Sequence, residues 1–428
     1  MGKGYLKYVN FEYKPTSNDM ICLFKFKPEK NRTRKEVAGA IAAESSTGTW
    51  TKLSTVSEKK QLTLGAKVFE VKGDYTKIAY PSELFENGNI PQILSAIAGN
   101  IFGMKEVETL RLEDIKWPRK IINSFKGPKF GIRGVRKITK IKKRPLSGTI
   151  IKPKVGLNEK QHAKVAYEAW LGGLDIVKDD ENLTCQSFNK FKKRARETIK
   201  LKNKAEKETG EKKIYMANVT AETNEMIKRA KYLKELGNEY LMVDVLTVGW
   251  SALQTLRDEN EKLKLVLHGH RAMHAALTRN KEHGISMLAL AQCSRLAGMD
   301  QLHIGTAVGK MEGEKQEIRT ILDNIEKQKV PETKRNFSQN WGKMKPVFSV
   351  CSGGLHPGHI PKLMEFFGND IIIQAGGGAH GHPDGTKKGA MAVRQAIDAC
   401  MKNISLKEYA KTHPELKKAI EKWGVYNG

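Results

Sequence analysis

Eight short apolar runs, mostly rich in β-branched residues, recur along the last two thirds of the chain and most constrain its fold. Between them lie segments long enough for helices, including 159–170, 223–236, 251–260 and 283–296. Strand and helix alternating eight times is typical of a (β/α)8 TIM barrel, an α/β fold that carries its chemistry at the carboxyl ends of its strands. The runs are Thr149 to Ile151, Leu174 to Val177, Ile214 to Val219, Tyr240 to Val245, Leu263 to Leu267, Leu302 to Ile304, Val347 to Val350 and Ile371 to Ile373.

The residues that follow six of these runs are rich in charge, histidine and glycine. Each has an ordinary structural explanation when taken alone; a lone histidine such as His274 is more often a packed or surface residue than a catalyst. Because the carboxyl ends of barrel strands converge on one rim, we expect these groups to form one site. They are Lys152 to Lys154; Lys178, Asp180 and Glu181; His268 to Arg271; His303 with a loop reaching Lys310; Ser352, Gly353 and Gly354; and Gly376, Gly377 and Gly378.

The second of these strand ends, Lys178 to Asn182, places one lysine among three carboxylates. Alternation along an extended chain puts Lys178 and Asp180 on one face, and a turn can bring Glu181 beside them. A charged run taken alone is more often a solvated turn. The alternative is a Mg2+ site, because Asp180 and Glu181 supply the oxygen ligands that this ion prefers. A lysine ammonium cannot coordinate the ion, whereas a carbamate formed from Lys178 and CO2 is an oxygen donor.

The remaining strand ends suggest a bisphosphate substrate. Glycine turns at 352–354 and 376–377 allow close approach of backbone N–H groups to one phosphate, and Arg271 and His303 offer side-chain donors to another. A metal ion between them would polarise a carbonyl and stabilise an enediolate, with nearby lysines adding positive charge. We therefore expect proton abstraction beside a carbonyl, followed by attack of the enediolate on an electrophile.

The first part of the chain, to about residue 126, has the mixed pattern of an α+β domain. Extended patches lie within 10–27, a helical pattern covers 34–43, and 66–80 resembles hairpin strands. The small-hydroxyl loop at 43–50 could hold a phosphate, although such loops are common. The basic segment from Lys126 to Arg144 has the composition of a linker onto the second domain.

Composition narrows the class of protein. The net charge is +28, but no zinc finger, aromatic RNA-binding motif or basic region with heptads accompanies it, so a solvated lysine-rich surface is favoured over nucleic-acid binding. No apolar run approaches the length of a membrane span and the start lacks a signal-peptide pattern, so we expect a cytoplasmic protein without a membrane partner. Five scattered cysteines without CxxC spacing argue against a zinc site or a disulfide framework.

Taken together and in chain order, the motifs resemble the large subunit of ribulose-1,5-bisphosphate carboxylase/oxygenase (RuBisCO). The combination of KPK, KDDEN and the GK-EGE loop is highly specific, whereas any single glycine motif is not. The resemblance implies a smaller α+β, ferredoxin-like domain at 1–126 and a catalytic barrel at 127–428. The matching stretches are AAESSTGTW (42–50), GNIFG (99–103), GTIIKPKVGL (148–157), GGLDIVKDDEN (172–182), HGHRAMH (268–274), HIGTAVGKMEGE (303–314), SGGLHPGH (352–359) and QAGGGAHGHP (374–383).

The resemblance also implies a role for each site residue. Lys178 would be the carbamylated lysine, with Asp180 and Glu181 as the other Mg2+ ligands. Lys152 and His270 would move protons, Lys154 would support Lys152, and Lys310 would hold the new carboxylate. The substrate contacts would be Arg271 and His303 at one phosphate; Thr49, Trp50, Gly353, Gly354, Gly376 and Gly377 around the other; Ser352 at a hydroxyl; and Glu44 and Asn100.

The cofactors implied are Mg2+ and the CO2 that activates Lys178, and the substrates are ribulose 1,5-bisphosphate with CO2 or O2. In this family the residues matching Glu44, Thr49, Trp50 and Asn100 come from the neighbouring subunit. A homodimer would therefore be the smallest active unit, alone or in an assembly of dimers.

Some departures indicate the subtype. Ile304 stands where plant-type enzymes carry a serine, and the chain is shorter than theirs at both ends. It is most similar to the archaeal form III group, which assembles without a small subunit and is linked to salvage of AMP and nucleosides. The rival is a RuBisCO-like enolase of methionine salvage. Such proteins replace several catalytic positions that here match the carboxylase pattern, so the carboxylase is favoured.

Overall fold

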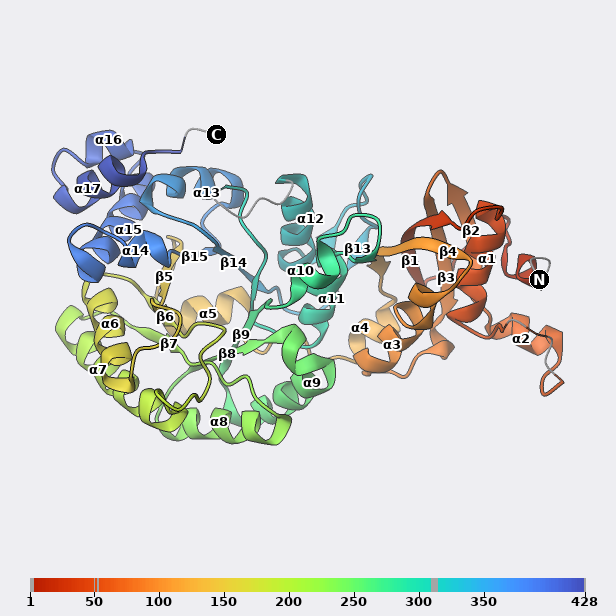
Figure 1. The fold of residues 1–428 in the computed structure, drawn as a ribbon, viewed down its shortest axis with the longest axis horizontal. Coiled ribbons are helices and arrows are strands. Elements are labelled where there is room, and N and C mark those ends of the chain that lie inside the picture. The colour runs from red at the N-terminus through yellow and green to blue at the C-terminus, as the bar shows by residue number, and fades with distance from the viewer. Residues whose placement is uncertain (1–3, 50, 52–53, 309–314, 427–428) are drawn as a thin grey trace. The chain divides into compact units, whose positions relative to one another are not determined.

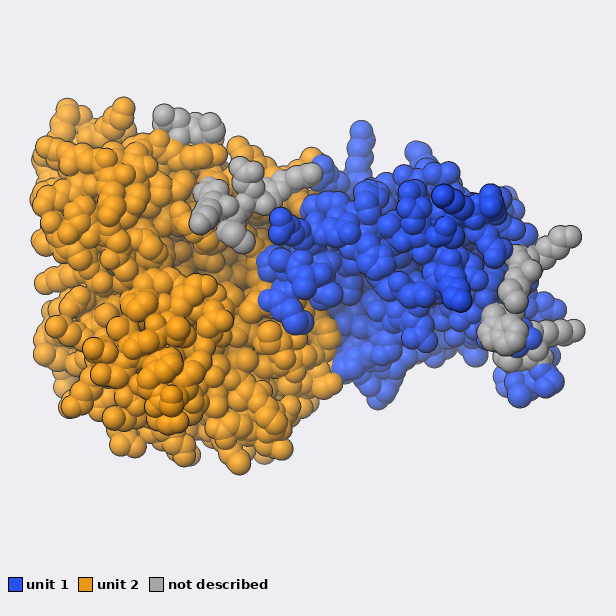
Figure 2. Space-filling view, viewed as in Figure 1, with its two compact units in different colours: residues 1–127, 273–297, 327–344 blue, residues 128–272, 298–326, 345–428 orange. Residues whose placement is uncertain are grey.

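The computed structural model describes residues 4–49, 51, 54–308 and 315–426. The chain divides into two compact units (Figure 2), each made of segments that are separate in the sequence. Unit 1 comprises residues 1–127, 273–297 and 327–344, and unit 2 comprises residues 128–272, 298–326 and 345–428. No helix among the described residues has both the length and the apolar character needed to cross a membrane.

Unit 1 is built on a sheet with the strand order β10-β4-β1-β3-β2. The pairs β1–β3, β1–β4 and β2–β3 are antiparallel, and the short β10 joins β4 in parallel. The order β4-β1-β3-β2, with a helix after β1 and another after β3, confirms the predicted ferredoxin-like domain. The strands are β1 (Asp19–Pro28), β2 (Lys67–Lys72), β3 (Tyr75–Pro81), β4 (Val107–Lys116) and β10 (Gly284–Ile285), with β12 (Lys329–Val330) and β13 (Gln339–Asn340) as a separate pair.

Helix α1 (Arg34–Glu44) shows why the small-hydroxyl loop follows it. The helix begins with a capping box in which Thr33 and Glu36 each accept a backbone N–H from the other. It ends where Ser46 Oγ donates to the Ala42 carbonyl at 2.6 Å, which turns the chain into the loop. The other helices of unit 1 are α2 (Glu58–Leu64), α3 (Ile90–Ile97), α4 (Arg119–Asn123), α10 (His274–Thr278) and α11 (Met287–Leu296).

Unit 2 is the predicted barrel (Figure 1), with eight parallel strands paired in chain order. The sheet runs β7-β6-β5-β15-β14-β11-β9-β8, and a parallel bridge between Asn218 and Met242 joins its two ends. All strand carboxyl ends therefore meet at one rim, the mouth of the barrel. The strands are β5 (Leu146–Ile150), β6 (Ile176–Lys178), β7 (Ile214–Met216), β8 (Tyr240–Asp244), β9 (Val266–His270), β11 (Gln301–His303), β14 (Phe348–Ser352) and β15 (Ile371–Gln374).

Each predicted run falls on or beside one of these strands, but one is misplaced. The run that begins at Leu263 starts too early, because helix α9 (Val245–Leu263) includes that residue and Lys264 ends the helix in the left-handed conformation. The outer helices of unit 2 are α6 (Glu159–Leu171), α7 (Phe191–Thr209), α8 (Thr223–Glu235), α9, α12 (Lys315–Glu326), α13 (Ile360–Phe367), α14 (Gly377–His380), α15 (Gly385–Met401), α16 (Leu406–Tyr409) and α17 (Pro414–Trp423).

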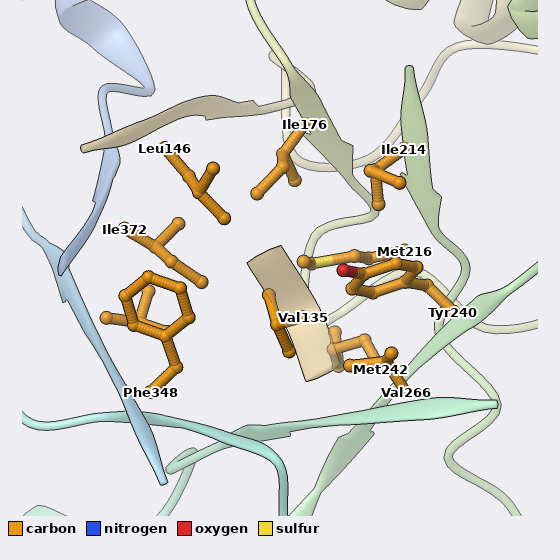
Figure 3. Close-up of a cluster of buried hydrophobic side chains, with 11 residues drawn as sticks. Val135, Leu146, Ile176, Ile214, Met216, Tyr240, Met242, Val266, Phe348 and Ile372 are labelled. Carbon is orange, nitrogen blue, oxygen red and sulfur yellow. The ribbon is translucent and has the colours of Figure 1, made fainter. Parts of the chain in front are cut away.

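The segment predicted to be a basic linker contains helix α5 (Gly131–Thr139). Its Val135 is fully buried among strand side chains at the amino ends of the strands, the floor of the barrel (Figure 3). The prediction was wrong because arginine and lysine outnumber the apolar residues of the segment, although the apolar ones share one face. The cluster that Val135 joins is Leu146, Ile176, Ile214, Met216, Tyr240, Met242, Val266, Phe348, Val350 and Ile372.

A second lysine-rich segment, Lys190 to Lys213, contains the whole of helix α7. Its buried face includes Phe191, Ala195, Ile199 and Ala205, while most of its lysines are exposed. This is the amphipathic pattern of an outer barrel helix. The lysine excess in this segment thus forms the predicted solvated surface.

Candidate active site

The end of β6 brings together the amine and the two carboxylates that the sequence singled out. Lys178 is fully buried, and its Nζ donates to the Asp179 carbonyl oxygen at 2.7 Å and lies 4.0 Å from Glu181 Oε2. Asp180 is also fully buried, whereas the Glu181 side chain is 25% exposed. The turn after the strand therefore gathers one amine and two carboxylates at the mouth, as predicted.

Two lysines that follow β5 balance these carboxylates. Lys152 Nζ forms an ion pair with Asp180 Oδ2 at 2.7 Å, and Lys154 Nζ lies 3.7 Å from Glu181 Oε1. Both lysines have long, flexible side chains whose ammonium groups can move without disturbing the strand. The negative charge of the site is thus matched by cations that a ligand could displace.

Asp179, between Lys178 and Asp180, points to the opposite side of the strand and has a different environment. It is fully buried, accepts hydrogen bonds from Arg194 Nε at 3.1 Å and from the Tyr215 hydroxyl at 2.8 Å, and lies 3.1 Å from His162 Nε2. Burial alone would raise its pKa, but the charge of Arg194 and the contact with His162 lower it instead. Asp179 therefore stays ionised and anchors the strand end to α6 and α7.

The pKa of Lys178 is lowered by burial, which the attraction of Glu181 and Asp244 offsets only in part. Burial raises the pKa of Asp180 and Glu181, yet the nearby lysines outweigh it, so the pKa of both carboxyls is lowered. The two carboxylates are therefore ionised at neutral pH. The buried amine loses its proton more readily than an exposed lysine does.

The histidines of β9 and β11 form a second group at the mouth. His270 Nδ1 lies 2.9 Å from Asp244 Oδ1, which leaves Nε2 facing Glu181 Oε2 at 3.7 Å. His303 bridges His268 and Ser352, with both contacts at 2.8 Å. Burial and neighbouring positive charges keep the pKa of His268 and His303 well below the usual value, so both rings are neutral.

The glycine turns and Arg271 lie at the same mouth. A Cβ added to Gly376 would lie 3.2 Å from Lys152 Cε, so this turn touches the lysine that pairs with Asp180. Gly353 and Gly354 both have positive φ, which favours glycine in the turn after β14. Arg271 Nη2 would lie 3.0 Å from a Cβ on Gly305, which follows β11, and burial lowers the Arg271 pKa to about 10, still well above neutral.

Five predicted residues are not among those described at the barrel mouth. Glu44, Thr49 and Asn100 lie in unit 1, where Glu44 Oε1 accepts a hydrogen bond from the Tyr5 hydroxyl at 3.0 Å. Trp50 and Lys310 lie outside the described residues. The predicted residues at the barrel strand ends thus lie together at one mouth. Glu44, Thr49 and Asn100 belong to the other compact unit of the chain.

The sequence analysis missed one residue at the mouth, Asp244, and included a second, His268, only as part of its motif. Asp244 orients His270, and His268 contacts His303. Asp244 is the last residue of β8, but the predicted run extended past it to Val245. Had the run ended at this carboxylate, the expectation that functional residues lie at strand ends would have identified Asp244. His268 was noted within its motif, but its inward direction follows from strand alternation along β9.

Known proteins are similar to this chain over nearly its whole length. Residues 131–423 match the family model of the ribulose bisphosphate carboxylase large chain, catalytic domain, and residues 7–121 match the N-terminal domain of the same chain. The ribulose bisphosphate carboxylase of Methanosarcina barkeri is 52% identical over 97% of this chain and 98% of its own length. That of Methanocaldococcus jannaschii is 52% identical over 98% of this chain and 100% of its own.

Solved structures give the same result. The dimeric archaeal Rubisco from Hyperthermus butylicus is 47% identical, with a TM-score of 0.94 over 99% of this chain and 100% of that one. The octameric enzyme from Pyrococcus horikoshii, in complex with sulfate, is 46% identical, with a TM-score of 0.91 over 99% of this chain and 98% of that one. Sequence and fold thus agree, and the chain belongs to the family of ribulose bisphosphate carboxylase large chains.

Proposed function

We propose that the chain is a ribulose-1,5-bisphosphate carboxylase/oxygenase. It enolises ribulose 1,5-bisphosphate and adds CO2, which yields two molecules of 3-phosphoglycerate, with O2 as the competing substrate. The observation that carries this proposal is the buried Lys178 amine beside Asp180 and Glu181, in a chain about half identical to relatives named as carboxylases.

The residues at the end of β6 fit a Mg2+ site that Lys178 completes. Among the described residues, no group of three or more His, Cys, Asp or Glu side chains is arranged to hold a metal. Asp180 and Glu181 provide two anionic oxygen ligands, and a third comes from Lys178 once its neutral amine bonds to CO2 and releases a proton. The lowered pKa of Lys178, caused mainly by burial, favours the neutral amine that this reaction needs. Mg2+ held by these residues would polarise the substrate carbonyl.

The protein groups around that position supply proton transfer and charge. Lys152 and His270 move protons at the substrate, and Asp244 holds the His270 ring with Nε2 toward the mouth. Lys154 adds positive charge on the side of Glu181. Ser352 contacts a substrate hydroxyl and is itself held by His303.

The two phosphates bind at opposite sides of the mouth. Arg271, which keeps its charge at neutral pH, and His303 bind one of them. The glycine turns bind the other through backbone N–H groups at Gly353, Gly354, Gly376 and Gly377. Glu44, Thr49, Trp50 and Asn100 reach the site from a neighbouring subunit, so the smallest active unit is a homodimer. A role of this protein in AMP and nucleoside salvage remains a prediction.

The test is incorporation of labelled CO2 by the purified protein, given ribulose 1,5-bisphosphate and Mg2+ after preincubation with bicarbonate. We expect labelled 3-phosphoglycerate from the wild type and none from a Lys178→Met variant that keeps its fold. Absence of product from folded, dimeric wild-type protein would contradict the proposal. Enolisation of the methionine-salvage substrate would then be the next measurement.

A further inference from the structure

The turn after β14 (residues 352–359) and the turn after β15 (residues 376–382) touch each other directly. A Cβ added to Gly378 would lie 2.2 Å from the Leu355 carbonyl oxygen and 2.6 Å from His356 Cα, so only glycine permits this approach. These two turns contain the glycines assigned above to one phosphate. Their relative position therefore sets how the backbone N–H groups converge.

Helix α17 and the residues after it contact both turns. On the β15 turn, Lys422 Nζ donates to the Gly381 carbonyl at 2.7 Å, and His382 Nε2 lies 3.0 Å from the Glu415 carbonyl oxygen. On the β14 turn, the Trp423 ring stacks on His356 with centroids 5.8 Å apart, and Tyr426 N donates to the Gly358 carbonyl at 3.1 Å. One carboxyl-terminal segment thus joins two turns that come from different strands.

The packing at this junction leaves little freedom. A Cβ on Gly358 would lie 2.1 Å from the Gly424 carbonyl oxygen, so the two backbones are in direct contact. The His356 and His359 rings lie 3.8 Å apart, and the Tyr426 ring lies 5.3 Å from His359. Burial lowers the pKa of His356 to about 4, so this ring is neutral and its Nδ1 accepts the Gly358 N–H.

We propose that Trp423 and Tyr426 are positioning residues for the reaction: they hold the β14 and β15 turns at the separation that binds one phosphate of the bisphosphate. The proposal rests on the function proposed above. It assigns the carboxyl-terminal segment a part in substrate affinity, in addition to its packing on the barrel.

The experiment compares the wild type with Trp423→Ala, Trp423→Phe and Tyr426→Ala. Three quantities are measured: KM and kcat for carboxylation, and the Kd of ribulose 1,5-bisphosphate without Mg2+ or CO2. We expect Trp423→Ala to raise KM and Kd about tenfold and to change kcat less than about twofold. Displaced phosphate-binding groups weaken binding of the substrate and of the transition state equally, and such a loss raises KM without lowering kcat. Trp423→Phe keeps an aromatic ring on His356 and should restore most of the affinity.

The matched control is Lys388→Ala, which removes an ion pair of 2.7 Å between α15 and the Glu415 side chain of α17 but leaves the Glu415 carbonyl that contacts His382 in place. It should leave KM and Kd unchanged. Tyr426→Ala, beyond the end of the helix, should raise both about threefold and decides the question if Trp423→Ala does not fold.

Unchanged KM and Kd in folded Trp423→Ala would overturn the positioning role, as would an equal loss in the Lys388→Ala control. A wild type that binds the bisphosphate but forms no labelled product would overturn the proposed function and leave the binding comparison intact. The two proposals therefore fail in distinguishable ways.

Discussion

Asp175 and Asp180 stand at the two ends of the same short strand, β6, and both are buried, but they are held in opposite ways. At the floor, the Asp175 carboxylate accepts hydrogen bonds from both Nη groups of Arg144, at 2.6 and 2.7 Å, and from the backbone N–H and hydroxyl of Ser147. At the mouth, one oxygen of Asp180 accepts hydrogen bonds from Asn182, and the other is balanced by the amine of Lys152. The floor carboxylate is saturated by fixed donors, whereas the mouth carboxylate can exchange its cation for a ligand.

The two fully buried lysines at these ends differ in the same way. Lys213, just before β7, donates to Glu211 at 2.8 Å and to the Leu174 carbonyl at 3.2 Å. Lys178 donates to one carbonyl and lies 4.0 Å from the nearest Glu181 oxygen, beyond hydrogen-bond length. Burial of charge alone therefore does not mark a site. A site is marked instead by a buried charge whose partner is a flexible side chain, or whose nearest partner lies beyond hydrogen-bond distance.

The largest effect is expected at Lys178. Lys178→Met keeps the volume of the buried side chain and removes the amine, so we expect carboxylation to fall about 10^4-fold, close to 5.5 kcal/mol of transition-state stabilisation. Steady-state assays measure this loss, and thermal unfolding checks the fold. Activity within tenfold of the wild type would contradict the account of the mouth.

Removing the charge of Asp175 at the floor should lower the stability of the protein rather than its activity. Asp175→Asn leaves the mostly buried Arg144 without its nearest counter-charge, so we expect a loss of about 3 kcal/mol in the free energy of unfolding with little change in kcat. Denaturant titration and carboxylation assays measure the two effects. A large fall in kcat with unchanged stability would show that the floor and the mouth are not distinct.

This loss should depend on pH. Burial raises the pKa of Asp175, but Arg144 outweighs it and the folded-state pKa is lowered. Its stabilisation is therefore fully present above the unfolded pKa of about 3.9 and is lost as pH falls through the lower folded value. The stability difference between the wild type and Asp175→Asn should be constant from neutral pH to about 5 and shrink below about 4.

At the mouth, Asp244→Asn should cost about 100-fold in kcat, because the amide no longer selects the His270 tautomer that leaves Nε2 facing the substrate. The Kd of ribulose 1,5-bisphosphate should stay the same. Thr220→Val is the matched control, since it removes a neighbour 3.3 Å from Asp244 Oδ2 and leaves the His270 contact in place. An equal loss in both variants would mean that Asp244 acts through packing.

The smallest effect is expected at Lys154, whose side chain is 57% exposed and 3.7 Å from Glu181. Lys154→Met should raise KM only about fivefold, because solvent screens the charge of this exposed side chain and its loss costs little. Lys193→Met is the control: its side chain is 60% exposed, its Nζ lies 3.6 Å from Glu159 Oε2, and the change should not alter KM. An effect of Lys154→Met as large as that of Lys178→Met would mean that Lys154 takes part in the chemistry itself.

The sequence predicts the mouth better than the floor, for a physical reason. Lys178, Asp180 and Glu181 are neighbours in the chain, and strand alternation with the barrel rule is enough to bring them together. Arg144 was assigned to a basic linker, yet it pairs with Asp175, and these two residues precede the neighbouring strands β5 and β6. That pairing depends on strand register and on the placement of α5, neither of which local spacing determines.

The most direct test of the difference between the two ends is 13C NMR of the protein with 13C-labelled bicarbonate, with and without Mg2+. We predict one carbamate resonance in the wild type that grows with Mg2+, disappears in Lys178→Met and persists in Lys213→Met, the equally buried lysine near the floor. A resonance that survives Lys178→Met, or one lost in Lys213→Met, would contradict the account.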